Sequence, residues 1–431
     1  MQKLSPNWPF NPRRIPFFYG WVIWLFSTLG FLFSIPGQTM GMAVFTDPLI
    51  DVLGLTRTEL SMAYLGGTIT SSLFLTRAGR WYDQYGGRFM ITFASIALGF
   101  MVFFISMTDI LANAFGGGAF ILILLGYFGV RFFGQGILTS CSRNVLLLWF
   151  VRRRGLVTGI RGIFVSFGFS IAPLLIAWLI TSLEWRYALW VMAGVVGILF
   201  STLALIFIRD NPASIGLKAD GGQLLPGDEK ETVKEAEYKT LEQARCDPVF
   251  WIYSCSLGIY ALFGTALTFH IVSIFSEAGR SKEEAFAYFL PSAVFSTSMN
   301  LLASWYVDKH SLKPFLILML LCFVVGAYGL LHLESAWGFW MLAAGMGSGG
   351  GLWGVISNLA YIRFFGIMNL GAISGLSSSF SVFASAVGPA AFALGYDATG
   401  DYSFGIKLCM GLLLILLSAA LLIRQQELER L

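Results

Sequence analysis

Apolar segments of about 20 residues recur along the whole length of this chain, and no other feature constrains its fold as strongly. A helix of about 20 apolar residues crosses a hydrocarbon core of roughly 30 Å. The apolar runs are continuous rather than alternating, so they indicate helices and not the strands of a barrel. Only 12% of the 431 residues are charged, whereas soluble domains average about 25%. The chain is therefore predicted to be a helical membrane protein, and a soluble globular fold is excluded.

We predict an all-α membrane protein with twelve transmembrane helices in two six-helix halves. The predicted spans are 17–46, 60–77, 89–107, 119–147, 155–181, 187–208, 248–276, 285–307, 314–332, 339–361, 370–394 and 403–423. The long hydrophilic segment 209–247 divides the chain between the sixth span and the seventh. The predicted domains are thus an N-terminal bundle (1–208), a cytosolic central loop (209–247) and a C-terminal bundle (248–431).

The placement of lysine and arginine predicts the orientation of these spans, because basic residues are enriched on the cytosolic side of a membrane. With the N-terminus inside, the cytosolic segments hold 20 of the 28 basic residues, and the outer loops hold five. Both termini and the central loop are therefore predicted to be cytosolic. The expected location is the plasma membrane, which is the inner membrane in a bacterium.

The two predicted halves repeat each other weakly. "GRWYD", which ends at Asp83, is echoed by "SWYVD", which ends at Asp308. A glycine and a proline are separated by the same interval in the fifth span (159–173) and in the eleventh (375–389). Parallel repeats of this kind place a substrate site near the middle of the membrane, between the halves.

The stretch "GRWYDQYGGR" contains the pattern G-x-x-x-D-x-x-G-x-R, formed by Gly79, Asp83, Gly86 and Arg88. This pattern resembles the signature of the major facilitator superfamily, and it lies between the second and third spans, where that family carries it. Together with the six-plus-six layout and the central loop, the resemblance covers the whole chain. It implies a transporter.

The carboxylate of Asp83 can accept hydrogen bonds at a helix N-terminus and pair with arginines. The family resemblance implies that this motif latches the two halves together on the cytosolic face in the outward-open state. The alternative is a plain basic anchor at the membrane surface. The second copy, which ends at Asp308, has Ser304 in place of the glycine, so a weaker latch is expected there.

Within that superfamily, "FYGW", "WFVRRRGLVTG" and "RFFGIMNLGAISG" resemble the monocarboxylate and oxalate:formate antiporter branch. The branch resemblance implies a carboxylate substrate. That branch binds its carboxylate through an arginine in the eighth span, and the matching position here is Asn300. The oxalate type also uses a lysine in the eleventh span, where this chain has none. The missing cations argue against a simple lactate-type transporter.

Arg131 lies close to the middle of the fourth span, roughly 18 Å from the outer surface at a rise of 1.5 Å per residue. An ionisable residue at this depth is costly and indicates function. The resemblance implies proton coupling or anion binding, although the spacing to the following glycine departs from the family's pattern. We predict that Arg131 attracts a substrate anion or controls a proton site. The alternative is a guanidinium that backbone carbonyls satisfy.

Three further ionisable residues lie within spans. His270 is the only histidine deep in a span, and histidine is a natural proton carrier because it titrates near neutral pH. The family resemblance implies that it faces the substrate cavity, and a packing role is the alternative. Arg143 and Arg161 lie nearer the cytosolic ends of their spans. They either line the inner cavity or extend to the interface, and the sequence leaves their roles open.

The first span is broken by Pro36 and Gly37, and such breaks free backbone groups where they line a cavity. Polar residues in this and other spans are further candidates for the substrate site: Gln38, Thr39, Tyr64, Asn300, Asn358 and Ser381. For each of them, a hydrogen bond between helices is the simpler interpretation. Together they predict a cavity that is polar but weakly charged.

We therefore predict a secondary transporter that works by alternating access and moves a small organic anion with a proton or in exchange for another anion. The alternative is a transporter of a neutral or amphipathic molecule, as in drug efflux. A transporter-like sensor is a third possibility. No nucleophile–base constellation and no nucleotide-binding motif is found, so we predict no enzyme and no cofactor, metal or nucleic-acid partner. The expected partners are the substrate, protons and the lipid bilayer, and a monomer is expected.

Overall fold

The computed structural model describes residues 5–221 and 238–424, and every element of regular structure that it describes is a helix. Within these residues, ten helices are long and apolar enough to cross a membrane. The twelve spans in chain order are α1–η2–α2 (Gly20–Leu32, Ile35–Gly37, Thr39–Ala43), α4 (Arg57–Tyr85), α5 (Gly87–Ser106), α7–η3–α8 (Ala119–Val130, Arg131–Leu138, Thr139–Trp149), α9 (Arg154–Leu183), α10–η4–α11 (Trp185–Gly194, Val195–Phe200, Ser201–Phe207), α13 (Pro248–Glu277), α15 (Phe289–Val307), α16 (Lys313–Leu331), α17 (Ala336–Phe365), α18 (Leu370–Thr399) and α19 (Ser403–Leu422). The shorter elements are η1 (Pro12–Arg14), α3 (Thr46–Leu53), α6 (Thr108–Ala114), η5 (Ala213–Ile215), α12 (Leu241–Cys246) and α14 (Lys282–Ala287).

Two of the twelve, α4 and α17, are long helices that fall short of the apolar content of the other ten. Arg77, Arg80 and Asp83 make the end of α4 polar, and α17 contains the glycine-rich stretch "GMGSGGGLWG". Both helices have well-formed starts, because the side chains of Thr56 and Ser335 accept hydrogen bonds from backbone N–H groups of the first turn. The predicted all-α architecture of twelve helices is confirmed.

The predicted break in the first span is also confirmed. α1 ends at Leu32, a short 3-10 turn (η2) contains Pro36 and Gly37, and α2 begins at Thr39. Proline lacks the backbone N–H that would continue an α-helix, which explains the interruption at this point.

The fourth span changes its helical type in the middle, which the sequence did not predict. α7 ends at Val130, and residues Arg131–Leu138 (η3) form a π-helix before α8 continues to Trp149. Gly134 of η3 lies directly against Gly37 of η2, since a Cβ built on Gly134 would lie 2.8 Å from the Cα of Gly37. π-Helical turns inside α-helices occur often at functional sites.

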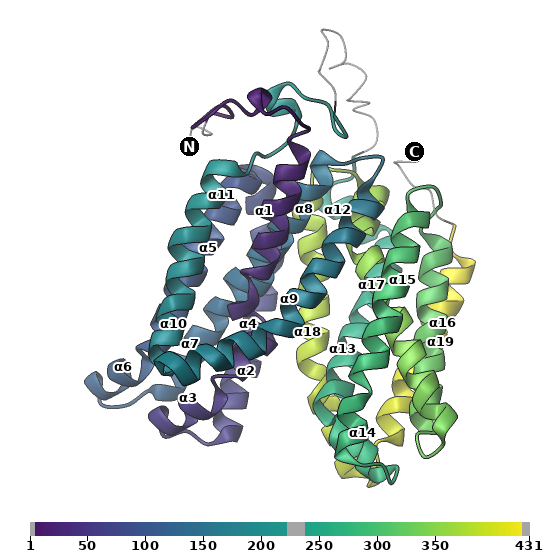
Figure 1. Ribbon diagram of the computed structural model, residues 1–431. Coiled ribbons are helices and arrows are strands. Elements are labelled where there is room, and N and C mark those ends of the chain that lie inside the picture. Colours follow the sequence, from purple (N-terminus) through teal and green to yellow (C-terminus); the bar gives the residue numbers. More distant parts are fainter. Residues whose placement is uncertain (1–4, 222–237, 425–431) are drawn as a thin grey trace. The chain divides into compact units, whose positions relative to one another are not determined.

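The chain divides into two compact units. Unit 1 comprises residues 1–152, 164–236 and 369–379, and unit 2 comprises 153–163, 237–368 and 380–431. Within unit 1, α1 packs against α8 and α4 against α7; within unit 2, α17 packs against α15 and α16 (Figure 1). The start of α9 thus belongs to unit 2 and the start of α18 to unit 1. The division into two halves and a central loop stays a prediction, and part of that loop lies outside the described residues.

Candidate functional site

Arg131 is the centre of a polar cluster in unit 1. Its side chain is 3% exposed, and Nη1 donates to the carbonyl of Gly37 at 3.2 Å and to Oγ1 of Thr39 at 3.4 Å. The ring of Tyr64 lies beneath the guanidinium, 5.3 Å from its carbon, and the Tyr64 hydroxyl donates to Thr39 Oγ1 at 2.9 Å. Three predicted site residues, Arg131, Thr39 and Tyr64, therefore meet at the broken first span.

The guanidinium of Arg131 keeps donor capacity that the cluster does not use. Its contacts in the described part of the chain are neutral oxygens and an aromatic ring, and no carboxylate is among them. Nε is fully buried and has no acceptor. A buried cation whose neighbours are all neutral favours the approach of an anion, because it bears a net positive charge in a medium of low dielectric constant.

Gln38 lies beside this cluster, but its side chain points along its own helix turn. Its Nε2 donates to Oγ of Ser34 at 3.1 Å. Gln38 is half-buried, whereas its neighbour Thr39 is exposed. Thr39 is thus the exposed member of the cluster.

His270, on α13 in unit 2, is half-buried and has partners at both ring nitrogens. Nε2 lies 2.9 Å from the carbonyl oxygen of Pro389, and Nδ1 lies 3.3 Å from the hydroxyl of Tyr402. A carbonyl only accepts, so Nε2 carries the proton. In the neutral ring Nδ1 is therefore the acceptor, and it takes the hydrogen bond of the Tyr402 hydroxyl.

A second polar cluster lies in unit 2. It contains the predicted residues Asn300 and Asn358, and also Arg161, whose role the sequence left open. Nη2 of Arg161 donates to Oδ1 of Asn358 at 2.9 Å, and Nδ2 of Asn358 donates to the carbonyl of Gly354 at 2.6 Å. Asn300 donates to the carbonyl of Gly351 at 3.0 Å. Asn300 also lies next to α9, because a Cβ on Gly162 would lie 3.1 Å from its Oδ1.

Two predicted substrate-site residues remain. Arg143 on α8 and Ser381 on α18 are both half-buried. Their predicted roles, like those of the other site residues, stay predictions.

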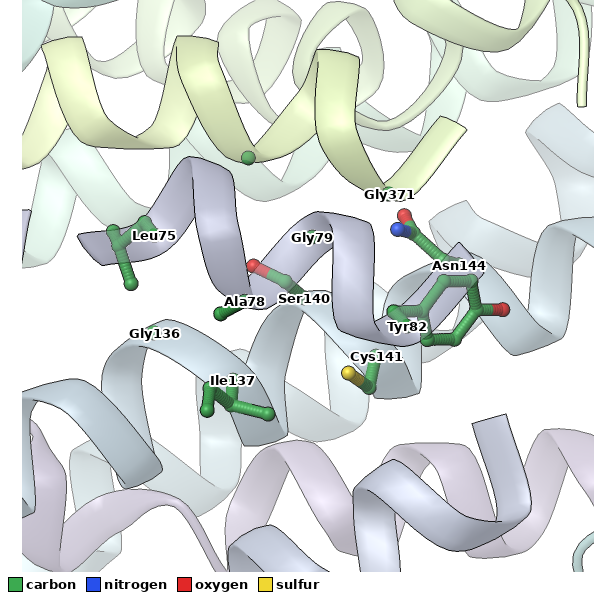
Figure 2. A pocket seen from close by; sticks show the side chains of 11 residues that line it. Leu75, Ala78, Gly79, Tyr82, Gly136, Ile137, Ser140, Cys141, Asn144 and Gly371 are labelled. Atoms are coloured by element: carbon green, nitrogen blue, oxygen red, sulfur yellow. The ribbon is translucent and has the colours of Figure 1, made fainter. Parts of the chain in front are cut away.

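Asp83 contacts the start of α18. Its two carboxylate oxygens accept hydrogen bonds from the backbone N–H groups of Gly371 and Ala372, each at 2.8 Å. Gly79 permits this contact, because a side chain there would collide with the carbonyl of Gly371. Figure 2 shows Gly79 and Tyr82 of α4 beside Gly371. A carboxylate at a helix N-terminus is favoured by the unpaired N–H groups and by the helix dipole.

Asp308 makes the equivalent contact in unit 2. Its oxygens accept from the backbone N–H groups of Gly155 at 2.7 Å and Leu156 at 3.1 Å, at the start of α9. Ser304, which replaces the motif glycine, packs against Gly159. Burial raises the pKa of the Asp308 carboxyl above its usual value, despite the backbone hydrogen bonds and the nearby arginines that lower it.

Arg88, the last residue of the motif, binds the N-terminal segment. Its Nη2 donates to the carbonyl of Trp8 at 2.7 Å and its Nη1 to that of Ser5 at 3.2 Å. Its backbone N–H donates to Asp210 at 2.8 Å. Gly86 leaves room for this carboxylate, because a Cβ there would lie 2.7 Å from it.

Arg209 supports the same segment from the end of the sixth span. It is 1% exposed and donates to the carbonyls of Pro6 at 2.6 Å and Trp8 at 2.9 Å. Its guanidinium carbon lies 5.2 Å from the centre of the Phe10 ring. Burial lowers the pKa of this guanidinium. Residues 5–10 therefore form a strap that two buried arginines hold.

A narrow cavity in unit 1, with room for about one water molecule, lies beside the Asp83 contact. Leu75, Ala78, Gly79, Tyr82, Gly136, Ile137, Ser140, Cys141, Asn144, Gly371 and Gly375 line it (Figure 2). The Tyr82 hydroxyl and Oδ1 of Asn144 are buried without a hydrogen-bond partner, while Nδ2 of Asn144 lies 3.3 Å from the hydroxyl of Ser374. The cavity is polar in part but too small for an organic solute.

Sequence reasoning missed three residues of these clusters. Gln135 lies on η3 with its Oε1 buried and unpartnered, and the glycines on both sides of it in "RFFGQG" were an available signal. Arg209 and Asp210 follow the sixth span directly and look like ordinary loop residues. No local pattern separates them from the other charges that follow the predicted spans.

Comparisons with known proteins decide the family. The family model described as Major Facilitator Superfamily matches residues 26–389, which is most of the chain. The chain belongs to the major facilitator superfamily. A search of curated protein sequences found no match. The predicted superfamily is thus confirmed, whereas the finer resemblance to the monocarboxylate and oxalate:formate branch stays a prediction.

Solved structures of this superfamily have the same fold. The proton:xylose symporter XylE bound to 6-bromo-6-deoxy-D-glucose matches with a TM-score of 0.71 and 15% identity, over 93% of this chain and 94% of that one. The E. coli fucose:proton symporter FucP matches with a TM-score of 0.59 and 15% identity, over 94% and 99%. The human organic anion transporter MFSD10 matches with a TM-score of 0.62 and 14% identity, over 94% and 100%. At these identities the likeness concerns the fold alone.

Proposed function

We propose that this protein is a secondary active transporter that moves a small organic anion, a carboxylate, across the membrane by alternating access. The observation that carries this proposal is Arg131. It is 3% exposed in the middle of the fourth span, and its contacts among the described residues are uncharged. Maintaining such a charge in a membrane is costly. A substrate that brings the missing negative charge explains why the residue is there.

The driving ion of this transport is a proton, or the substrate is exchanged for another anion. His270 supports the first mode, because its Nδ1 carries no proton and accepts one hydrogen bond, from the Tyr402 hydroxyl at 3.3 Å. A proton taken up at Nδ1 turns both ring nitrogens into donors, so the Tyr402 hydroxyl must reverse its role. Proton uptake therefore changes a contact between α13 and the segment that precedes α19.

The two helix-start contacts support a gating role on the cytosolic side. Asp83 binds the start of α18 and Asp308 binds the start of α9, each through two backbone N–H groups. Alternating access requires contacts that form in one state and break in the other. These carboxylates are suited to such a latch, since their partners are backbone groups at fixed positions.

The proposal includes the expected setting of the protein. It is a multi-pass protein of the plasma membrane, or of a bacterial inner membrane, with cytosolic termini, and it works as a monomer. Its sequence motifs resemble those of the monocarboxylate and oxalate:formate branch. The position of the branch's arginine is occupied by Asn300, so the anion is bound by Arg131 in the N-terminal half.

A neutral or amphipathic substrate is the second candidate, and the cluster in unit 2 favours it. Asn300 and Asn358 place carboxamides there, and each donates to a backbone carbonyl of α17. Carboxamides suit hydroxyl groups and other neutral polar groups, because they can both donate and accept.

Transport into liposomes separates the two candidates. The purified protein is reconstituted, and uptake of labelled mono- and dicarboxylates and of neutral solutes is measured with and without an inward proton gradient. Gradient-stimulated uptake of a carboxylate supports the proposal. Uptake of neutral or amphipathic compounds alone contradicts it and favours the second candidate.

Arg131→Gln gives the matching residue-level prediction. The substitution removes the charge and keeps a hydrogen-bond donor, so affinity for the carboxylate should fall by about tenfold or more, as expected when one charged hydrogen-bond partner is lost. The measurement is the concentration dependence of uptake. Full transport with unchanged affinity would remove Arg131 from the anion site.

A further inference from the structure

The π-helix η3 puts Arg131 and Gln135 on one face. Residues four apart are neighbours along the surface of an α-helix, and the wider π-helical turn, with its i→i+5 hydrogen bonds, keeps them on one face. Both residues border Gly37 of the broken first span. Arg131 donates to the Gly37 carbonyl, and a Cβ on Gly37 would lie 2.8 Å from the backbone nitrogen of Gln135.

The two side chains carry complementary groups without partners. Among the residues that the structure describes, Nε of Arg131 is a buried donor that has no acceptor, and Oε1 of Gln135 is a buried acceptor that has no donor. Buried polar groups without partners are rare and costly, so each such group calls for an explanation. Oε1 of Gln135 is the kind of acceptor that Nε of Arg131 lacks, and both side chains belong to the same short π-helix.

The opposite ends of the same side chains are the donors that remain for a ligand. Nη2 of Arg131 and Nε2 of Gln135 make no hydrogen bond within the described residues, and neither is among the fully buried unpartnered atoms. A guanidinium edge and a carboxamide N–H together match the two oxygens of a carboxylate. The existing bonds of Nη1, at 3.2 and 3.4 Å, are long.

We propose that Gln135 is a positioning residue for Arg131 in anion recognition. Oε1 of Gln135 accepts the hydrogen bond of Arg131 Nε when the substrate carboxylate binds, and this fixes the plane of the guanidinium. The carboxylate then binds Nη2 of Arg131, and Nε2 of Gln135 adds a second donor. This inference rests on the proposed function, and it adds that recognition of the anion needs the carboxamide as well as the cation.

Two substitutions of Gln135 test this role in opposite ways. Gln135→Leu removes the acceptor and the donor, so the KM for the carboxylate should rise by about tenfold while kcat changes little. Gln135→Glu keeps the shape but places a negative charge beside Arg131. The resulting ion pair neutralises the guanidinium, so carboxylate binding at neutral pH should be lost.

Binding and transport are both measured, so that a folding defect is recognised. Binding is measured as the thermal stabilisation of the purified protein by a carboxylate and by its primary amide, which is the neutral analogue. Transport is measured as counterflow exchange without a proton gradient. Gln84→Glu, an exposed position at the end of α4, is the matched control for the added charge. A merely structural role of Gln135 would lower stability without changing the preference for the carboxylate over its amide.

The outcomes separate this inference from the function on which it rests. Loss of carboxylate preference in both variants, with the control behaving as wild type, supports it. Gln135→Leu and Gln135→Glu proteins that bind the carboxylate as well as wild type would overturn it and leave the proposed function intact. A wild-type protein that binds no carboxylate would overturn both.

Discussion

His270 is held in one tautomer by its surroundings. The carbonyl of Pro389 accepts from Nε2 at 2.9 Å, and Nδ1 faces the hydroxyl of Tyr402 at 3.3 Å. We expect His270→Gln to abolish the stimulation of uptake by a proton gradient, because an amide takes up no proton in this pH range. Counterflow exchange, which needs no net proton movement, should continue.

The Tyr402→Phe variant is the control for this prediction. It keeps the histidine but removes the hydroxyl at Nδ1, so proton-driven uptake should persist with a shifted pH profile. Gradient-driven accumulation by His270→Gln at the wild-type level would show that another group carries the proton.

The depth of a residue in its predicted span and the polarity of its side chain were enough to select single candidates for the substrate site from the sequence. Arg131, Thr39 and Tyr64 were each expected at the substrate site, and the structure brings these three together. Gln135 was not selected, although it follows Arg131 by four residues, because the sequence does not show that its Oε1 is buried without a partner among the described residues. The contact of Arg161 with Asn358 likewise joins helices that are far apart in sequence, and no local pattern encodes it.

At the scale of helices, the starts of α18 and α9 are each capped by a carboxylate from another helix. Asp83→Asn replaces the charged acceptor of two N–H groups with a neutral one, which should weaken the contact by about 2 kcal/mol. We expect the cytosolic side to open more often. The measurement is the labelling rate of an engineered cysteine at the start of α18, which should increase by about tenfold or more.

Asp308→Asn is the natural comparison, since Asp308 contacts α9 in the same manner. The expected weaker latch in the second copy predicts a smaller change in labelling at the start of α9. Equal effects of the two substitutions would contradict the expected difference between the copies. No effect of either would leave the basic-anchor interpretation of the motif.

Most helices were predictable to within a few residues, because the apolar runs are long. The exception is α4, which continues to Tyr85, eight residues beyond the predicted end of the second span at 77, so that Gly79 and Asp83 lie on the helix and not in a loop. The break at Pro36 was predictable, since proline removes a backbone donor. The π-helix was not, because its change of hydrogen-bond register leaves no distinct residue pattern in "RFFGQGIL". The grouping of the first residues of α9 with unit 2, and of α18 with unit 1, also depends on contacts between distant segments.

At the scale of the whole molecule, the strap of residues 5–10 contacts two segments of unit 1 that are far apart in the sequence. Arg88 lies just after the motif turn, and Arg209 follows the sixth span. Both guanidiniums donate to the carbonyl of Trp8, at 2.7 and 2.9 Å. Buried guanidiniums need acceptors, and here the backbone of the strap supplies several of them.

Deletion of residues 2–10 should therefore destabilise the protein by about 2–4 kcal/mol, because it removes charge-assisted hydrogen bonds from both Arg88 and Arg209. Thermal unfolding of the purified protein measures this loss. Replacement of Trp8 and Phe10 by alanine keeps the carbonyls and removes only the ring contacts, so its effect should be smaller, about 1 kcal/mol. Asn7→Ala, at an exposed position next to Trp8, should have none. An unchanged unfolding temperature after the deletion would mean that water replaces the strap without cost, and it would contradict a stabilising role for the strap.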